Sequence, residues 1–217
     1  MSMSVEQFLS LSDAEQLQTI KDLNDIGQEE IIIDVLTGIG IDNLSVPLLG
    51  ELGRAYNNND KPEEAIKVFK AIDTEHRDAA WHYRCAYSHG SIASTNHEAY
   101  TSENMQQMLA LVDRGVQLAT KEDRNDIKEY CFEVMDMCRL QMDFEKCEVD
   151  YPDLCLNYSK YIAEKKKKRE GVPRQRTITV EEILATDDMW TINEPAYWTI
   201  NIYGSYDNYL ESAKGFT

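Results

Sequence analysis

The chain has 217 residues, of which 42% are hydrophobic and 28% are charged. This ordinary globular composition excludes the class of intrinsically disordered chains, which have low hydrophobicity. The 39 Asp and Glu residues outnumber the 22 Lys and Arg residues, so the formal net charge is −17. Because a phosphate-binding surface needs clustered cationic side chains, this charge argues against direct binding to nucleic acid or to an anionic membrane. It favours a protein or peptide partner, in particular a basic one.

Basic residues are concentrated in one segment. Eight of the 22 lie between Lys160 and Arg176, and the rest of the chain holds 14 basic and 37 acidic residues, a balance of −23. The run from Lys165 to Arg169 suits the end of a helix, where cations compensate the negative end of the dipole. A patch for nucleic acid or for localisation is the alternative.

No pattern in the sequence announces catalysis or a metal. It lacks a glycine-rich phosphate loop, a nucleophile elbow and a zinc-protease motif, so we expect no enzyme and no cofactor. The cysteines form no CxxC pair and no short Cys/His cluster, which argues against zinc and favours a reduced, cytoplasmic chain. They are Cys85, Cys131, Cys138, Cys147 and Cys155. We expect neither a secretory leader nor a run of the about 18 apolar residues that a membrane span needs.

The first predicted helix begins at Asp13. Ser12 and Glu15 have the spacing of a capping box, in which each side chain binds the other residue's free backbone amide. An apolar stripe follows and is interrupted at Gly27. A second helix is predicted from Gln28, and Gly38 and Gly40 supply the conformational freedom that ends helices.

The next segment predicts a pair of helices. Ser45 precedes Pro47, a residue tolerated in the first helical turn because amides there lack helical partners. The segment Asn57–Asp60 is predicted to break this helix, and Pro62 to begin the next one. The apolar and small positions of the pair are Leu49, Leu52, Gly53, Tyr56, Ala65, Phe69 and Ile72.

Two further pairs complete the predicted elements. The third runs over 78–90 and 103–120, and its link, Ser91 to Ser102, is predicted to be an insertion or an extended loop. The fourth runs over 121–144 and 152–170, with Ile127, Tyr130, Val134 and Cys138 on one stripe. We therefore predict an all-α repeat domain of antiparallel helical hairpins over residues 1–170.

The spacing of Leu52-Gly53, Tyr56, Ala65 and Phe69 resembles the tetratricopeptide repeat, a helical hairpin of about 34 residues. The segment from Trp81 to Tyr87 resembles a degenerate copy of it. The resemblance implies a right-handed solenoid whose concave surface is formed by the first helix of each hairpin. It also implies partner-binding residues on that surface.

The residues that this resemblance places on the concave surface come from two successive units. They are Arg54, Asn57, Asn58, Tyr83 and Tyr87. For the two tyrosines an equally weighted alternative is that they pack between hairpins, because most aromatic residues at helical spacing lie in the core.

Residues 171–217 are predicted to form a linker and the start of a second helical domain. Seven of the chain's 20 aromatic residues lie in its last 28 residues. The segment from Trp190 to Phe216-Thr217 resembles the start of a bacterial domain family that includes an acidic DNA-mimic protein. That family continues well beyond this point, so the resemblance implies a bacterial origin and a truncated C-terminal domain.

The four histidines lie close in sequence, but their spacing is not that of a metal site. His82 and His89 are seven residues apart, which separates them by about 10 Å along a helix. Adjacent zinc ligands on a helix are instead four residues apart. We therefore predict structural or solvated roles for the histidines, and buried positions for Cys131 and Cys138.

Three functions are compatible with these patterns. The first is an interaction module that binds a partner protein on a helical concave face. The second is an acidic decoy or immunity-type protein, which neutralises a basic partner or mimics DNA. The third is the regulatory half of an enzyme whose catalytic part lies outside this sequence.

Overall fold

The computed structural model describes residues 3–170, with side chains up to residue 167. Over this part the chain is helical and contains no strand, which confirms the predicted all-α class. Short 3-10 turns lie at Ile41–Asn43 (η1) and Thr74–His76 (η2). The α-helices are α1 Val5–Leu9, α2 Asp13–Asp25, α3 Glu29–Ile39, α4 Val46–Asn58, α5 Pro62–Lys70, α6 Ala79–Thr95, α7 Glu103–Lys121, α8 Asn125–Met137, α9 Phe144–Asp150 and α10 Pro152–Glu170. The predictions for residues 171–217 lie outside the described residues.

Chain contacts divide the protein between Lys165 and Lys166, inside α10. This point lies five residues before the boundary predicted at residue 170. The first unit, Met1–Lys165, contains helices α1 to α9 and most of α10.

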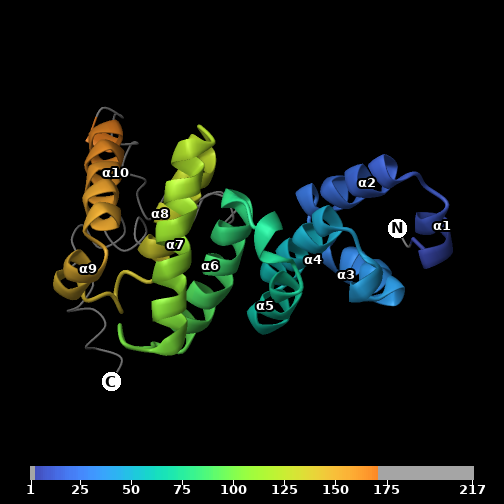
Figure 1. Cartoon of the computed structure of the whole chain (residues 1–217), viewed down its shortest axis with the longest axis horizontal. Coiled ribbons are helices and arrows are strands. Elements are labelled where there is room, and N and C mark those ends of the chain that lie inside the picture. Colours follow the sequence, from blue (N-terminus) through green and yellow to red (C-terminus); the bar gives the residue numbers. More distant parts are fainter. Residues whose placement is uncertain (1–2, 171–217) are drawn as a thin grey trace, which may run out of the picture. The chain divides into compact units, whose positions relative to one another are not determined.

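Within the first unit, neighbouring helices pack in a repeating order. Helices α2 and α3, α4 and α5, and α6 and α7 form antiparallel pairs in contact, and the second helix of each pair also contacts the first helix of the next. The first helices contact one another in turn, α2 with α4, α4 with α6, and α6 with α8. Figure 1 shows these pairs following one another along the chain.

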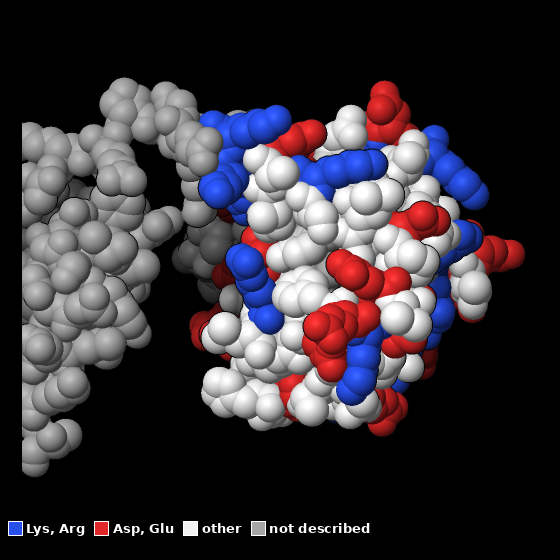
Figure 2. All heavy atoms as spheres, turned by 90° about the vertical axis from the view of Figure 1, so that its left-hand side faces the viewer, with Lys and Arg blue, Asp and Glu red and all other residues white. Residues whose placement is uncertain are grey.

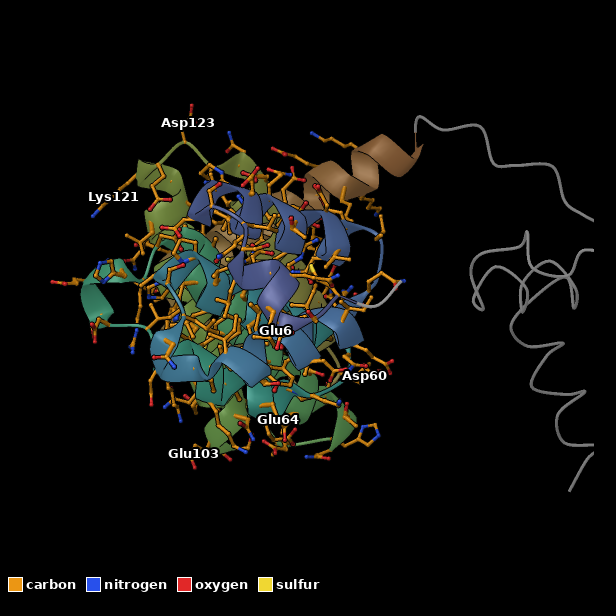
Figure 3. All side chains as sticks on the ribbon, turned by 90° about the vertical axis from the view of Figure 1, so that its right-hand side faces the viewer. Glu6, Asp60, Glu64, Glu103, Lys121 and Asp123 are labelled. Atoms are coloured by element: carbon orange, nitrogen blue, oxygen red, sulfur yellow. The ribbon has the colours of Figure 1, made fainter. Side chains whose placement is uncertain are left out.

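The turns within pairs and the turns between pairs lie at opposite edges. Figure 3 shows Asp60 from the α4–α5 turn, Glu64 from the first helical turn of α5 and Glu103 from the start of α7 at one edge. Lys121 and Asp123, from the α7–α8 turn, lie at the other. The chain therefore runs up and down between two edges, as stacked hairpins require.

Two apolar clusters of buried residues form the core, and α6 contributes to both. The N-terminal cluster runs from Phe8 to Cys85, and it receives Trp81 and Cys85 from α6. The C-terminal cluster runs from Ala79 to Tyr158, and it receives small α6 residues, among them Ala86. Helix α6 is thus buried on two opposite faces.

The crossing of α4 and α5 depends on a glycine. A Cβ atom at Gly53 would lie 2.9 Å from Cδ1 of Phe69 and closer still to the next ring atoms. Phe69 is fully buried, and its ring also meets that of Trp81 edge to face, with 6.5 Å between centroids. At this crossing the aromatic ring of Phe69 thus packs directly on the α4 backbone at Gly53.

Helix starts agree with the prediction more closely than helix ends. Helix α2 begins at Asp13, and the Ser12 N–H donates to the Glu15 carboxylate at 2.9 Å, as the capping box requires. The hydrogen bonds from Ser12 lower the pKa of Glu15. Helix α5 begins at Pro62.

Three predicted boundaries are wrong at the C-terminal ends of helices. Helix α4 continues through Asn58, and the turn is made by Asp60, whose φ is 52°. Helix α6 continues to Thr95, because Ala93 is fully buried and holds the last turn against the core. The predicted helix over 121–144 ends at Met137, where Cys138 turns inward and is buried.

Two short helices were not predicted. Helix α1 begins with a capping box, in which the Ser4 N–H donates to Gln7 Oε1 at 2.9 Å and the Gln7 N–H donates to Ser4 Oγ at 3.2 Å. It places Phe8 in the N-terminal cluster. Helix α9 begins after Asp143, whose carboxylate accepts a hydrogen bond from the Lys146 N–H at 3.2 Å.

Replacing Gly53 with alanine should destabilise the protein, although alanine favours helix. The new methyl group would displace the Phe69 ring, and overpacking of this kind costs about 1–3 kcal/mol. Gly50→Ala in the same helix is the matched control, since its Cβ would lie 3.4 Å from Arg84 Nη1, at the margin of ordinary van der Waals contact. Urea unfolding should show a loss for Gly53→Ala, partly restored by adding Phe69→Leu. Equal stability of the two glycine variants would contradict the proposed crossing.

Candidate partner-binding face

Polar side chains link the first helices of successive hairpins. We call Asn24, Asp25, Glu51, Arg54 and Arg84 the Glu51 network. Asp25 on α2 accepts a hydrogen bond from Arg54 Nη2 on α4 at 2.9 Å. Arg84 on α6 returns toward α4, where its Nη1 donates to the Gly50 carbonyl at 3.0 Å. The network therefore spans three helices on the side where α2, α4 and α6 contact one another.

Glu51 is the buried centre of this network. Its side chain is only 6% exposed. Its carboxylate accepts hydrogen bonds from Asn24 Nδ2 at 2.9 Å and from Arg84 Nη2 at 3.0 Å, and Arg54 Nη1 lies 3.6 Å away. Burying a carboxylate is costly unless it is paired and hydrogen-bonded, and the two guanidinium groups supply that pairing.

Three of the predicted binding residues lie on α4, and the structure uses them differently. The Arg54 side chain is 32% exposed, but its guanidinium is already paired with acidic partners. Asn57 is buried; its Nδ2 donates to the Arg84 carbonyl at 3.0 Å, and its Oδ1 accepts from Ser88 Oγ at 2.7 Å. Asn58 is exposed and donates to Glu29 at 3.4 Å. Asn57 thus joins α4 to α6 rather than facing solvent.

The tyrosines on α6 lie beside a third tyrosine on α8. We call Tyr83, Tyr87 and Tyr130 the tyrosine group. Tyr83 and Tyr130 stack with 5.2 Å between ring centroids and 28° between ring planes. Tyr83 and Tyr87 are partly buried against the C-terminal cluster, in agreement with the alternative that they pack between hairpins, and their role in partner binding stays a prediction. Burial raises the pKa of Tyr83, and the nearby charge of Glu133 raises it further.

Tyr130 was predicted on a buried stripe, and this is wrong. Its side chain is 43% exposed, although Ile127 and Val134 of the same stripe are buried. A tyrosine at an amphipathic boundary carries an apolar ring and a polar hydroxyl, so periodicity alone cannot place it.

Sequence reasoning also missed Glu51 and Arg84. A visible signal was present for Glu51, which stands between Gly50 and Leu52 in an otherwise apolar part of α4. A carboxylate at such a position needs cationic partners. The sequence does not show that Arg84, 33 residues later, supplies one of them.

Among the four histidines, His89 is buried and His82 is partly buried, whereas His76 and His97 are exposed. His82 Nδ1 lies 2.8 Å from the Asp78 carbonyl, and His89 Nδ1 lies 2.9 Å from Asn104 Oδ1. Burial lowers the pKa of both imidazoles. All five cysteines are buried thiols, as predicted for Cys131 and Cys138. Among the described residues, no group of three or more His, Cys, Asp and Glu side chains is placed to hold a metal ion.

None of the helices in the described part combines the length and the apolar character that crossing a membrane requires. No protein family matches the chain, and no similar curated protein or solved structure was found. The resemblance of residues 52–69 to the tetratricopeptide repeat therefore stays a prediction.

Removing the Glu51 carboxylate should destabilise the fold. Glu51→Ala leaves Asn24 and Arg84 without their buried partner, and we expect the free energy of unfolding to fall by about 2–4 kcal/mol, because both arginines reach some solvent. Urea unfolding measures this. Glu129→Ala, an exposed position on α8, is the matched control and should change stability by less than about 0.5 kcal/mol. If the two variants lost equal stability, Glu51 would not be the centre of the network.

Proposed function

We propose that this protein is a tetratricopeptide-like interaction module. It binds an extended or helical segment of a partner protein along the first helices α2, α4, α6 and α8. The observation that carries this proposal is the stacked, solvent-reaching pair Tyr83 and Tyr130 on that side. In this proposal Tyr87 and Asn58 extend the contact surface, and Arg54 lies at its edge.

Helix order supports a solenoid. In a stack of hairpins the first helices contact one another in series, and the second helices form the opposite side. The contacts of α2 with α4, α4 with α6 and α6 with α8 have this order. A single hairpin cannot bury its apolar face, so such a stack exposes a long side made only of first helices.

The chemistry of this side favours a partner that carries Lys or Arg next to an apolar residue. A cation within about 6 Å of a tyrosine ring is attracted to its face, at about 0.5–1 kcal/mol for an exposed site. Glu133 is close enough to Tyr83 to raise its pKa, so it adds a carboxylate near the rings. The net charge of −17 attracts the same class of partner over a longer range.

An acidic decoy is the alternative, and it is motivated by the net charge and by the resemblance of residues 190–217 to the domain family that includes a DNA-mimic protein. A decoy needs a concentrated field of one sign. On the face that Figure 2 shows, acidic, basic and uncharged side chains are interspersed. This face therefore presents no concentrated field of one sign.

Selection of peptides from a random display library on the full chain tests the proposal. We expect the selected peptides to be enriched in Lys or Arg with neighbouring apolar residues. The double variant Tyr83→Ala/Tyr130→Ala should weaken their binding by about tenfold or more, since truncation of central aromatic residues typically costs about 2 kcal/mol or more. Fluorescence anisotropy with one selected peptide measures the change.

The control for this test is Leu140→Ala, which truncates a side chain that is 95% exposed in the turn between α8 and α9. It should leave the affinity unchanged, and all variants should keep the helical circular dichroism of the parent. If a selected peptide bound the double variant Tyr83→Ala/Tyr130→Ala as tightly as Leu140→Ala, the tyrosine group would not be part of the binding site. Binding that vanishes at high salt but ignores the tyrosines would favour the acidic decoy.

A further inference from the structure

Two buried thiols meet where α9 packs on α10. Cys147 lies on α9 and Cys155 on the first turns of α10, and their Sγ atoms are 3.0 Å apart. The Cys147 side chain is fully buried and that of Cys155 is 4% exposed. A disulfide bond measures about 2.05 Å, so the sulfur atoms need to approach by only about 1 Å to reach bonding distance.

The other cysteines have different surroundings. Cys138 donates a hydrogen bond to the Gly90 carbonyl at 3.3 Å. Cys131 lies beneath Gly115, where an added Cβ would be 3.0 Å from its sulfur. Cys85 belongs to the N-terminal cluster, whereas the other four belong to the C-terminal cluster. Sulfur-to-sulfur contact is thus specific to Cys147 and Cys155.

Helix α9 is held to the rest of the unit by few side chains, among them Phe144, whose ring stacks on that of Tyr158 with 6.0 Å between centroids. It has seven residues, and Cys147 is its single buried one. Val149 on the same helix is 81% exposed. Near its end, Asp150 accepts a hydrogen bond from the buried Tyr100 hydroxyl at 3.0 Å. A short helix with one buried residue opens at low free-energy cost, which gives solutes access to the thiols.

We propose that Cys147 and Cys155 form a reversible redox site, which takes up a low-molecular-weight disulfide such as oxidised glutathione and becomes an intramolecular disulfide. This inference is independent of the proposed binding face. The oxidised form ties α9 covalently to α10, and the reduced form leaves α9 attached through packing and the Tyr100 contact.

The reaction balances in two exchanges. The Cys155 thiol loses its proton, and its sulfur attacks one sulfur of the small disulfide, which releases one thiolate and leaves a mixed disulfide. The Cys147 thiol then loses its proton and attacks the Cys155 sulfur, which expels the second thiolate. The two released thiolates take up the two protons, so two cysteine thiols are oxidised and one small disulfide is reduced to two thiols.

Burial determines which sulfur attacks first and how fast. Burial raises the pKa of both thiols. The hydrogen bond between the two sulfur atoms raises the pKa of Cys147 further. Cys155 is also the more exposed of the two. Since the thiolate is the nucleophile, Cys155 attacks first, and exchange is slow and limited by the opening of α9.

Thiol counting and mass spectrometry on the full chain test the proposal. After incubation of the folded protein with oxidised glutathione, free thiols should fall from five to three and return to five on adding dithiothreitol. Trypsin cleaves after Lys146 and Lys160, so both cysteines lie in one peptide, residues 147–160. That peptide should lose the mass of two hydrogens.

Variants separate this site from general thiol oxidation. Cys155→Ser should keep its four thiols or carry only a glutathione adduct, whereas the control Cys85→Ala should still lose two. Should Cys155→Ser fold poorly, the mass of peptide 147–160 from the parent chain decides. Five thiols that persist in the folded chain, a glutathione adduct without loss of two hydrogens, or a disulfide between other cysteines would overturn the proposal.

Discussion

The structure depends on α6 being buried on two opposite faces. On one face, Trp81 and Cys85 complete the N-terminal cluster, and the Trp81 indole N–H donates to the Phe69 carbonyl at 3.0 Å. On the other face, small residues such as Ala86 let α7 and α8 approach closely. Gly90 continues that face, since a Cβ there would lie 2.9 Å from Met137. Because neither half of the chain covers its own apolar surface without α6, the two clusters stabilise each other through one helix.

Apolar packing sets the stack, and the Glu51 network specifies the alignment of its helices. Apolar contacts are non-directional, so they alone allow neighbouring hairpins to slide. Glu51 requires Asn24 from one side and Arg84 from the other at hydrogen-bonding distance. Asn57 adds two more directional bonds between α4 and α6. The side chains that fix the alignment lie on the side where the first helices meet.

Sequence patterns predicted the helix starts well because caps are local. Ser12 with Glu15, and proline in the first turn at Pro62, act within a few residues of the helix they begin. Helix ends were predicted less well. Helix α6 continues past the polar Ser91 because Ala93 is buried against the core, and this depends on partners that are distant in sequence.

The candidate face shows the same difference between local signals, which the sequence reveals, and contacts between residues distant in sequence, which it does not. The resemblance predicted Tyr83 and Tyr87 on the first helix of a hairpin, and both lie on α6. It could not distinguish Asn57, which is buried between helices, from Asn58, which is exposed. The partnership of Tyr83 with Tyr130 joins residues 47 positions apart, and only the packing of α6 on α8 brings them together. The contact of Cys147 with Cys155 likewise needs the turn between α9 and α10.

Hydrogen exchange of the folded chain, followed by mass spectrometry of its peptides, tests the central role of α6 most directly. The backbone amides of a helix that both clusters share open only when the whole unit unfolds, so the α6 peptides should be the slowest to exchange. The peptides of α1 and α9, which bury one residue each, should exchange much faster. If α6 exchanged as fast as α1 and α9, the two clusters would be independent of each other, and α6 would not be the helix on which the fold depends.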